Sequence, residues 1–163
     1  MIPSEKRLIL FLSAGTMLWC VAYTLAPVIG PENPLGQWLY FFFSPICHQL
    51  PLRSFHLLSE PMAVCSRCAG IYYGFLVALI VYPRVRSLCR RIEQSLKVLI
   101  FASLPMIIDV IISRLGILSN NYLHALTGVI LGSVSFCFIL PPILEWIGKK
   151  SLAEGKPYGT DAQ

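Results

Sequence analysis

The chain has 163 residues, of which 56% are hydrophobic and 13% are charged, and its mean hydropathy is +0.69. Soluble domains carry about 25% charged residues, so a soluble fold of this length is excluded and the expected solvent is lipid. The net charge of +5 is not gathered into a basic stretch interleaved with aromatic residues, so nucleic acid is not an expected partner.

Four apolar stretches are each long enough to cross a hydrocarbon core of ~30 Å as a helix. The sequence therefore predicts an all-α integral membrane protein, a four-helix bundle with a single domain over residues 1–150. The first stretch is longer than the apolar part of a signal peptide, so we expect it to be retained. The polar residues 151–163 are expected to form a disordered cytoplasmic tail. The expected spans are approximately residues 8–29, 64–82, 96–112 and 122–147.

The connections between these stretches differ in composition. Residues 37–43 are rich in aromatic side chains, which favour the membrane–water boundary. The segment between Pro51 and Pro61 is expected to be irregular or partly helical. After Pro83, residues 84–97 contain five basic residues and one acidic residue, which predicts a short cytoplasmic loop.

The basic residues also predict the orientation in the membrane. Lys6 and Arg7, residues 84–97, and Lys149 with Lys150 all fall on one side of a four-span protein. Cytoplasmic segments carry an excess of lysine and arginine, so both termini are expected to be cytoplasmic. The loop that begins at Cys47 then faces outward. The expected location is a bacterial cytoplasmic (inner) membrane, crossed several times.

The outward-facing Cys/His loop gathers thiols and imidazoles in an otherwise apolar chain. Cys65 and Cys68 are three residues apart, so both sulfur atoms can reach one ion at Zn–S distances of ~2.3 Å. Cys47 is the expected third thiolate ligand. His48 is expected either as the fourth ligand or just outside the ligand set. We expect zinc first, with iron as the other candidate metal.

Charged residues are expected to surround these ligands and to orient them. Arg53 and Arg67 lie in the same stretch as the cysteines. Asp109 lies in an apolar helix, where an ionisable group is costly unless it is functional or paired. Pairing with Arg53, Arg67 or Arg114 and a role as a metal ligand are equally expected for it. His124 is a further candidate for the fourth ligand position and otherwise belongs to the surrounding set.

Two other interpretations of the cysteines remain open. Cys65-x-x-Cys68 at the outer end of a helix is the layout of membrane thiol–disulfide oxidoreductases, which work with a quinone in the lipid. Those enzymes usually need a second cysteine pair in the loop, whereas Cys47 is the one cysteine left there. A structural disulfide, either Cys47–Cys65 or Cys65–Cys68, would staple the loop and leave one thiol unexplained.

A third class of function is a small subunit of a larger membrane complex. Gly70-xxx-Gly74 and Gly128-xxx-Gly132 form small-residue faces that let another helix approach closely. These faces suit packing inside the chain, a membrane-protein partner or a homo-oligomer. Whether the protein is an enzyme is left open.

Several other residues have simple structural interpretations. Cys20 and Cys137 lie in apolar runs and Cys89 in an arginine-rich segment, and all three are expected to be packing or incidental thiols. Asn120 and Asn121 are expected to cap the fourth span.

The sequence also resembles a known group. The motif Cys47-His-Gln-x-Pro-x-Arg-Ser-Phe55, followed by Cys65-x-Arg-Cys68-x-Gly-Ile-Tyr72-x-Gly74, is similar to the bacterial membrane-protein family called domain of unknown function 2085. Asp109, the pair Asn120-Asn121, and Thr127-Gly128 with Gly132 extend the resemblance. The resemblance implies a membrane protein and the same choice of site residues, and it implies no activity.

Overall fold

The computed structural model describes residues 3–93, 95–117 and 120–153, and it confirms the all-α architecture. The predicted tail begins within the last helix, and residues 154–163 lie outside the described part of the chain. The helices are α1 (Pro3–Ile29), α2 (Pro34–Phe43), α3 (Ser66–Glu93), α4 (Leu96–Arg114) and α5 (Asn121–Ala153). Between α2 and α3 lie a 3₁₀ turn, η1 (Pro51–Arg53), and two short strands, β1 (His56–Leu57) and β2 (Glu60–Pro61).

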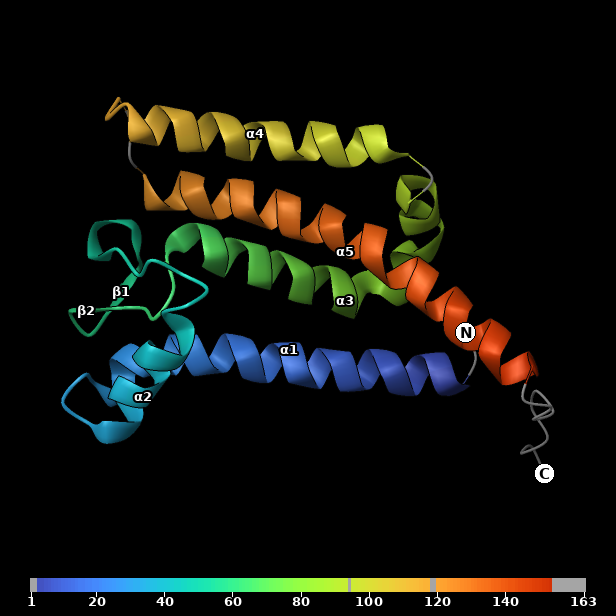
Figure 1. The fold of residues 1–163 in the computed structure, drawn as a ribbon, viewed down its shortest axis with the longest axis horizontal. Coiled ribbons are helices and arrows are strands. Elements are labelled where there is room, and N and C mark those ends of the chain that lie inside the picture. Colours follow the sequence, from blue (N-terminus) through green and yellow to red (C-terminus); the bar gives the residue numbers. More distant parts are fainter. Residues whose placement is uncertain (1–2, 94, 118–119, 154–163) are drawn as a thin grey trace.

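The four long helices lie side by side in the order α1, α3, α5, α4 (Figure 1). All four are long and apolar enough to cross a membrane. The start of α1 and the far end of α5 lie at one end of the bundle, here called the terminal end. The opposite end, here called the loop end, carries α2, residues 44–65, the last turn of α4 and the first turn of α5. The Cys-rich stretch and the ends of α4 and α5 therefore meet at the loop end.

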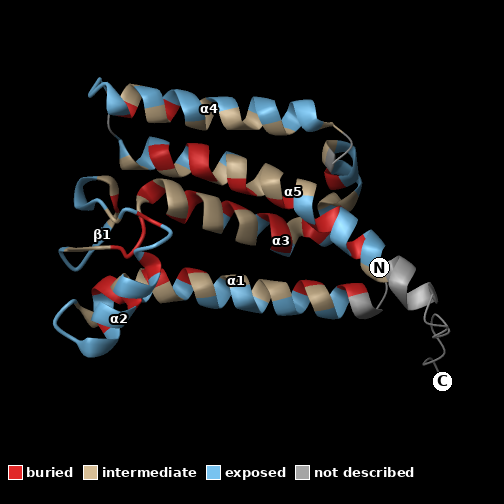
Figure 2. Cartoon of the chain, in the orientation of Figure 1, coloured by how far each residue is buried: buried red, intermediate tan, exposed pale blue. Residues whose placement is uncertain are grey.

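Large apolar side chains face outward along the long helices. Phe11 on α1 is 76% exposed and Phe101 on α4 is 69% exposed. Figure 2 shows exposed residues along most of α4, whereas buried residues concentrate in α3 and α5. An apolar surface of this extent is unfavourable in water and is expected where lipid tails surround the helices. The structure thus fits a membrane bundle.

The close contact of α3 with α5 depends on glycine. A Cβ atom at Gly70 or Gly74 would overlap backbone atoms of α5, and one at Gly128 or Gly132 would overlap backbone atoms of α3. The predicted internal packing of the glycine faces is confirmed. In this chain α3 and α5 cover these faces for each other, and docking of a partner or a second copy through them stays a prediction.

The predicted cytoplasmic loop at residues 84–97 is mostly helical, which corrects the expectation of a loop after Pro83. Helix α3 continues through Pro83 to Glu93. A proline inside a membrane helix is tolerated where the surroundings compensate for the missing hydrogen bond. Here the extension is held by Arg86, which donates from Nη1 and Nη2 to the two carboxylate oxygens of Glu5 at 3.1 and 2.9 Å.

A disulfide joins Cys89 of α3 to Cys137 of α5, so the prediction that these two are incidental thiols is wrong. No local feature of the sequence links them, because one lies in an arginine-rich segment and the other in an apolar run. They meet because α3 extends beyond Pro83 and keeps packing along α5, in a buried cluster that includes Tyr82 and Phe136. Cys20 is a buried free thiol, as predicted.

Candidate metal centre

The loop between α2 and α3 is folded around the side chain of Gln49. Gln49 adopts a left-handed backbone conformation with φ of 48°. Its Nε2 donates to the carbonyl oxygen of Tyr40 at 2.7 Å and to that of Ala63 at 2.9 Å. One side chain thereby joins α2 to the returning end of the loop, close in sequence to Cys47 and Cys65.

The middle of the loop is a hairpin that leads the chain back to α3. Strands β1 and β2 are antiparallel and are joined by Leu58 and Ser59, both at positive φ. This conformation matches the right-handed twist of two short strands. The hydroxyl of Tyr40 donates to the carbonyl oxygen of Pro61 at 2.5 Å, so α2 holds one edge of the hairpin.

Hydrogen bonds from α3 and α5 hold the other side of the loop. Ser66 Oγ donates to the carbonyl oxygen of Arg53 at 2.9 Å. Asn121 Nδ2 donates to the carbonyl oxygen of Ser54 at 3.0 Å. The 3₁₀ turn η1 is therefore fixed to the first turn of each helix. Asn120, rather than Asn121, caps α5, because its Oδ1 accepts from the backbone N–H of Tyr122 at 2.9 Å.

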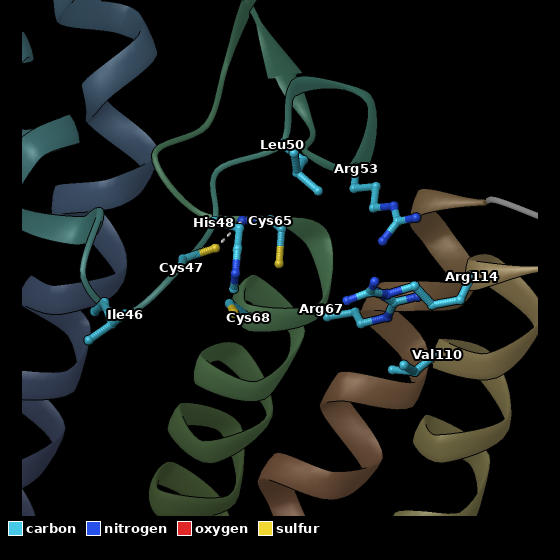
Figure 3. Close-up of a pocket in the computed structure, with 10 residues that line it drawn as sticks. All are labelled: Ile46, Cys47, His48, Leu50, Arg53, Cys65, Arg67, Cys68, Val110 and Arg114. Atoms are coloured by element: carbon cyan, nitrogen blue, oxygen red, sulfur yellow. Dashed lines mark hydrogen bonds between the residues drawn. The ribbon is translucent and has the colours of Figure 1, made fainter.

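Three cysteines meet at the loop end. The sulfur atoms of Cys47, Cys65 and Cys68 lie within 4.8 Å of one another. All three are free thiols, and Cys47 is only 4% exposed. The first turn of α3 begins at Ser66, so it places Cys65 and Cys68 on the side that faces the returning loop. The backbone N–H of Cys65 donates to Cys47 Sγ at 3.1 Å (Figure 3).

Hydrogen bonding decides which of these thiols loses its proton first. The thiols of Cys65 and Cys68 donate to Cys47, and with backbone donors they outweigh burial and lower the pKa of Cys47 to about 2. The pKa of Cys65 is raised, chiefly because it donates to Cys47. These opposite shifts favour loss of the Cys47 proton before the Cys65 proton, and thiolate sulfur is the form that binds metals and attacks disulfides.

The cluster opens into a pocket of about 350 Å³. Figure 3 shows the cysteines and His48 on one side of this pocket and three arginine side chains on the other. His48 shares the pocket with the three sulfur atoms, but the group of donors within 4.8 Å contains only the cysteines among the described residues. The pocket is lined by Ile46, Cys47, His48, Leu50, Arg53, Cys65, Arg67, Cys68, Val110 and Arg114.

A buried charge network lies directly behind the pocket. Arg67 Nε donates to Asp109 Oδ2 at 2.7 Å. His124 Nδ1 lies 2.7 Å from Asp109 Oδ1, the distance of a hydrogen bond in which the imidazole N–H donates to the carboxylate. Asp109 is 5% exposed and His124 is 1% exposed. The network joins α3, α4 and α5 beside the Cys65-x-x-Cys68 turn.

The structure brings together most of the residues that the sequence selected. Arg67 is the partner of Asp109 among the three arginines considered. Arg53 instead donates from Nη2 to the carbonyl oxygen of Ser113 at 3.4 Å. His124 contacts Asp109 and is absent from the residues that line the pocket. His56 lies in β1, is exposed and does not line the pocket.

Sequence reasoning missed three contributors to the site. Gln49 closes the loop, but a single glutamine in a loop gives no signal of its own. Asn121 was assigned only to capping. Arg114 was considered only as a partner for Asp109, yet it lines the pocket as the last residue of α4. Its position at a span end, on the same side as the Cys-rich loop, was the available signal.

Comparison with known families matches residues 47–138 to the family described as "Predicted membrane protein (DUF2085)". The chain belongs to this family. The match begins at the first cysteine of the cluster. It covers all three cysteines, the loop from Cys47 onward, α3, α4 and the part of α5 up to Phe138. The sequence resemblance is thereby confirmed.

Two archaeal relatives are also similar to this chain. An uncharacterized protein of Methanocaldococcus jannaschii is 42% identical over 113 residues, which are 69% of this chain and 72% of that protein. An uncharacterized protein of Methanothermobacter thermautotrophicus is 32% identical over 92 residues, which are 53% of this chain and 78% of that protein. These relatives do not support the bacterial part of the expectation. No solved structure matches the chain.

The structure gives several motif residues of this DUF2085 chain a physical role. Cys47, Cys65 and Cys68 form the thiol cluster, and Gln49 closes the loop that carries them. Ser54 Oγ donates to the carbonyl oxygen of Leu50 at 3.0 Å and so stabilises the turn around η1. Much of the motif therefore builds one site rather than a set of separate features.

Proposed function

We propose that the loop end holds one zinc ion, with Cys47, Cys65 and Cys68 as thiolate ligands and His48 as the fourth ligand. The observation that carries this proposal is the approach of three sulfur atoms to within 4.8 Å of one another. Tetrahedral Zn–S bonds of ~2.3 Å place sulfur atoms about 3.8 Å apart, so small side-chain rotations would bring the three sulfur atoms onto one ion. A thiolate at Cys47 supplies the first anionic ligand.

The surrounding charges support the same proposal. The Arg67–Asp109–His124 network fixes the turn that carries Cys65 and Cys68, which is the role of groups that orient metal ligands. Arg53 belongs to this set through its backbone, because its carbonyl oxygen accepts the Ser66 hydroxyl. Four protein ligands make a closed zinc site that stabilises the fold, whereas three would leave a position for a substrate or water.

Elemental analysis of the detergent-purified protein tests the metal proposal. We expect about one zinc ion per chain, by the usual structural-site stoichiometry. Cys65→Ser and Cys68→Ser should lose the metal, whereas Cys20→Ser, a buried thiol outside the cluster, should keep it. His48→Ala should lower zinc affinity by about 10–100-fold, and the matched variant His56→Ala should leave it unchanged. Finding iron instead would keep the site and change the metal.

A second candidate function is supported by the Cys47 thiolate. It lies beside both members of a Cys-x-x-Cys pair, the geometry needed for thiol–disulfide exchange. Oxidation of Cys65 and Cys68 to a disulfide releases two electrons and two protons, which a quinone in the lipid would accept. Purified protein without metal, in which these two thiols react only after addition of reductant, would overturn the zinc proposal and support this one.

The orientation is part of the proposal. With the terminal end in the cytoplasm, as the basic residues predict, the site opens to the outside of a cytoplasmic membrane. Ser59 at the hairpin tip and Ser87 on the α3 extension are both exposed. In intact cells, Ser59→Cys should react with a membrane-impermeant maleimide above the background of the unsubstituted chain, whereas Ser87→Cys should react only after permeabilisation. The reverse pattern would invert the topology.

A further inference from the structure

The wall of the pocket opposite the thiols is strongly basic. Arg53, Arg67 and Arg114 come from η1, the first turn of α3 and the last residue of α4. Figure 3 shows their side chains gathered on the same side of the pocket. Three segments that are distant in sequence thus place a guanidinium group on one small cavity, whose ten lining residues include no aspartate or glutamate.

Within the described part of the chain, a carboxylate neutralises only one of these three charges. Arg67 pairs with Asp109. Arg53 has a single long hydrogen bond, to the neutral carbonyl oxygen of Ser113 at 3.4 Å. Arg114 is exposed and makes no ion pair with a described carboxylate. Like charges gathered in a partly closed space repel one another unless an anion lies between them.

We propose that this pocket binds a phosphate group, held between the guanidinium groups of Arg53 and Arg114, with Arg67 forming the fixed wall beside it. Guanidinium groups donate pairs of parallel hydrogen bonds to phosphate oxygens. One guanidinium group can satisfy both oxygens of a planar carboxylate with such a pair of hydrogen bonds. Donors from three segments instead suit a tetrahedral group with several oxygens.

The size and depth of the pocket define the ligand further. At about 350 Å³ it has room for a phosphate and for part of the molecule that carries it. Arg67 and Arg114 lie at the ends of the spans Ser66–Ile92 and Leu96–Arg114, which is the level of lipid headgroups. Ile46 and Leu50 add an apolar rim. The phosphate therefore comes either from a lipid headgroup or from a soluble molecule that reaches the membrane surface.

Binding measurements on the purified chain in a neutral detergent test this site. Thermal unfolding is followed during titration with inorganic phosphate, against chloride at equal ionic strength, and separately with a short-chain phosphatidic acid. Stabilisation by inorganic phosphate identifies a soluble ligand, and stabilisation by phosphatidic acid alone identifies a lipid headgroup. If neither probe stabilises the protein, the proposal is wrong.

Matched arginine variants locate the site. Arg53→Gln and Arg114→Gln should each weaken binding by at least about tenfold, as expected for lost charge-assisted hydrogen bonds. Arg84→Gln removes an equal charge from the exposed terminal end and should leave the affinity unchanged. An equal loss in all three variants would mean general charge attraction and would overturn the proposal. If Arg53→Gln does not fold, Arg53→Lys is used in its place. This variant should still bind phosphate more weakly than the unsubstituted chain, because lysine keeps the charge but cannot donate two parallel hydrogen bonds to one phosphate.

The phosphate site and the zinc site are separable in the same samples. Arg114→Gln should lose phosphate binding and keep its metal. Cys65→Ser should lose metal and keep the arginine-dependent binding. Failure of one proposal is therefore visible without failure of the other.

Discussion

Arg67 donates from Nε to Oδ2 of Asp109 across 2.7 Å, and this buried ion pair connects the Cys-x-x-Cys turn of α3 to the part of α4 near the loop end. Helix α4 packs chiefly against α5 and has little contact with α3. The pair is therefore the main polar link between α4 and the thiol cluster. His124 of α5 contacts the same carboxylate, so one aspartate organises three helices at the loop end.

Asp109→Asn is expected to destabilise the protein by about 3 kcal/mol, because it leaves the buried Arg67 charge without its partner. Unfolding in detergent, followed by circular dichroism, measures the change. The double variant Asp109→Asn with Arg67→Gln should be more stable than the sum of the two single effects predicts, because the second change removes the unpaired charge. Strict additivity would show that the two side chains are not coupled.

Gly128→Ala is expected to cost about 1–3 kcal/mol, because the added Cβ would overlap the backbone carbonyl of Arg67 and push α3 away from α5. The matched control is Gly15→Ala on α1, where a Cβ has nothing within 4 Å. That substitution should be neutral or slightly stabilising, since alanine favours helices. Equal effects at the two positions in a thermal unfolding assay would contradict close α3–α5 packing.

Stability of the metal-free protein should depend on pH through the cysteine cluster. The pKa of Cys47 falls to about 2 in the folded chain, against ~8.5 for an ordinary thiol. Between these two pKa values the unfolded chain binds a proton that the folded chain lacks. The stabilisation that Cys47 contributes is therefore complete above the ordinary thiol pKa and is lost as pH falls toward the folded pKa. Cys65 acts in the opposite sense: its raised pKa gives a contribution that is lost as pH rises above the ordinary value.

Ultraviolet absorbance of the thiolate checks this assignment in chelator-treated protein. The band should be present at neutral pH in the unsubstituted chain and in Cys20→Ser, and it should be much weaker in Cys47→Ser. The Cys47→Ser variant should also lose the decline in unfolding free energy on acidification. Appearance of the band only near the ordinary thiol pKa would show that Cys47 is not a thiolate.

The disulfide gives a definite thiol count. Of the six cysteines, four are free and two are joined. After chelation and denaturation without reductant, alkylation should modify four residues by mass spectrometry, and reduction should expose two more at Cys89 and Cys137. The bond closes a loop of 48 residues, so replacing both cysteines by alanine should lower stability by up to about 4 kcal/mol. Modification of all six without reductant would remove this link between α3 and α5.

The four long helices were predictable because lipid offers no hydrogen-bond partners, so each apolar stretch must satisfy its backbone internally as a helix. Cys47, Cys65 and Cys68 were also predictable as a group. Two of them share one helical turn, and the short loop to the third keeps it near. The glycine faces indicated a close helix contact, although not which helices would make it.

Only the tertiary structure decided which side chains from different helices meet. Apolar composition does not determine which spans are neighbours in space, because lipid tails solvate every apolar helix surface equally well. The spatial order of the helices depends instead on how their surfaces fit together. The contact of His124 with Asp109, the bond between Cys89 and Cys137 and the presence of Arg114 beside the thiol pocket all follow from the order α1, α3, α5, α4. The sequence by itself determined the four long helices and the chemistry of the loop, and the packing of α3 on α5 placed α4 and its charges beside that loop.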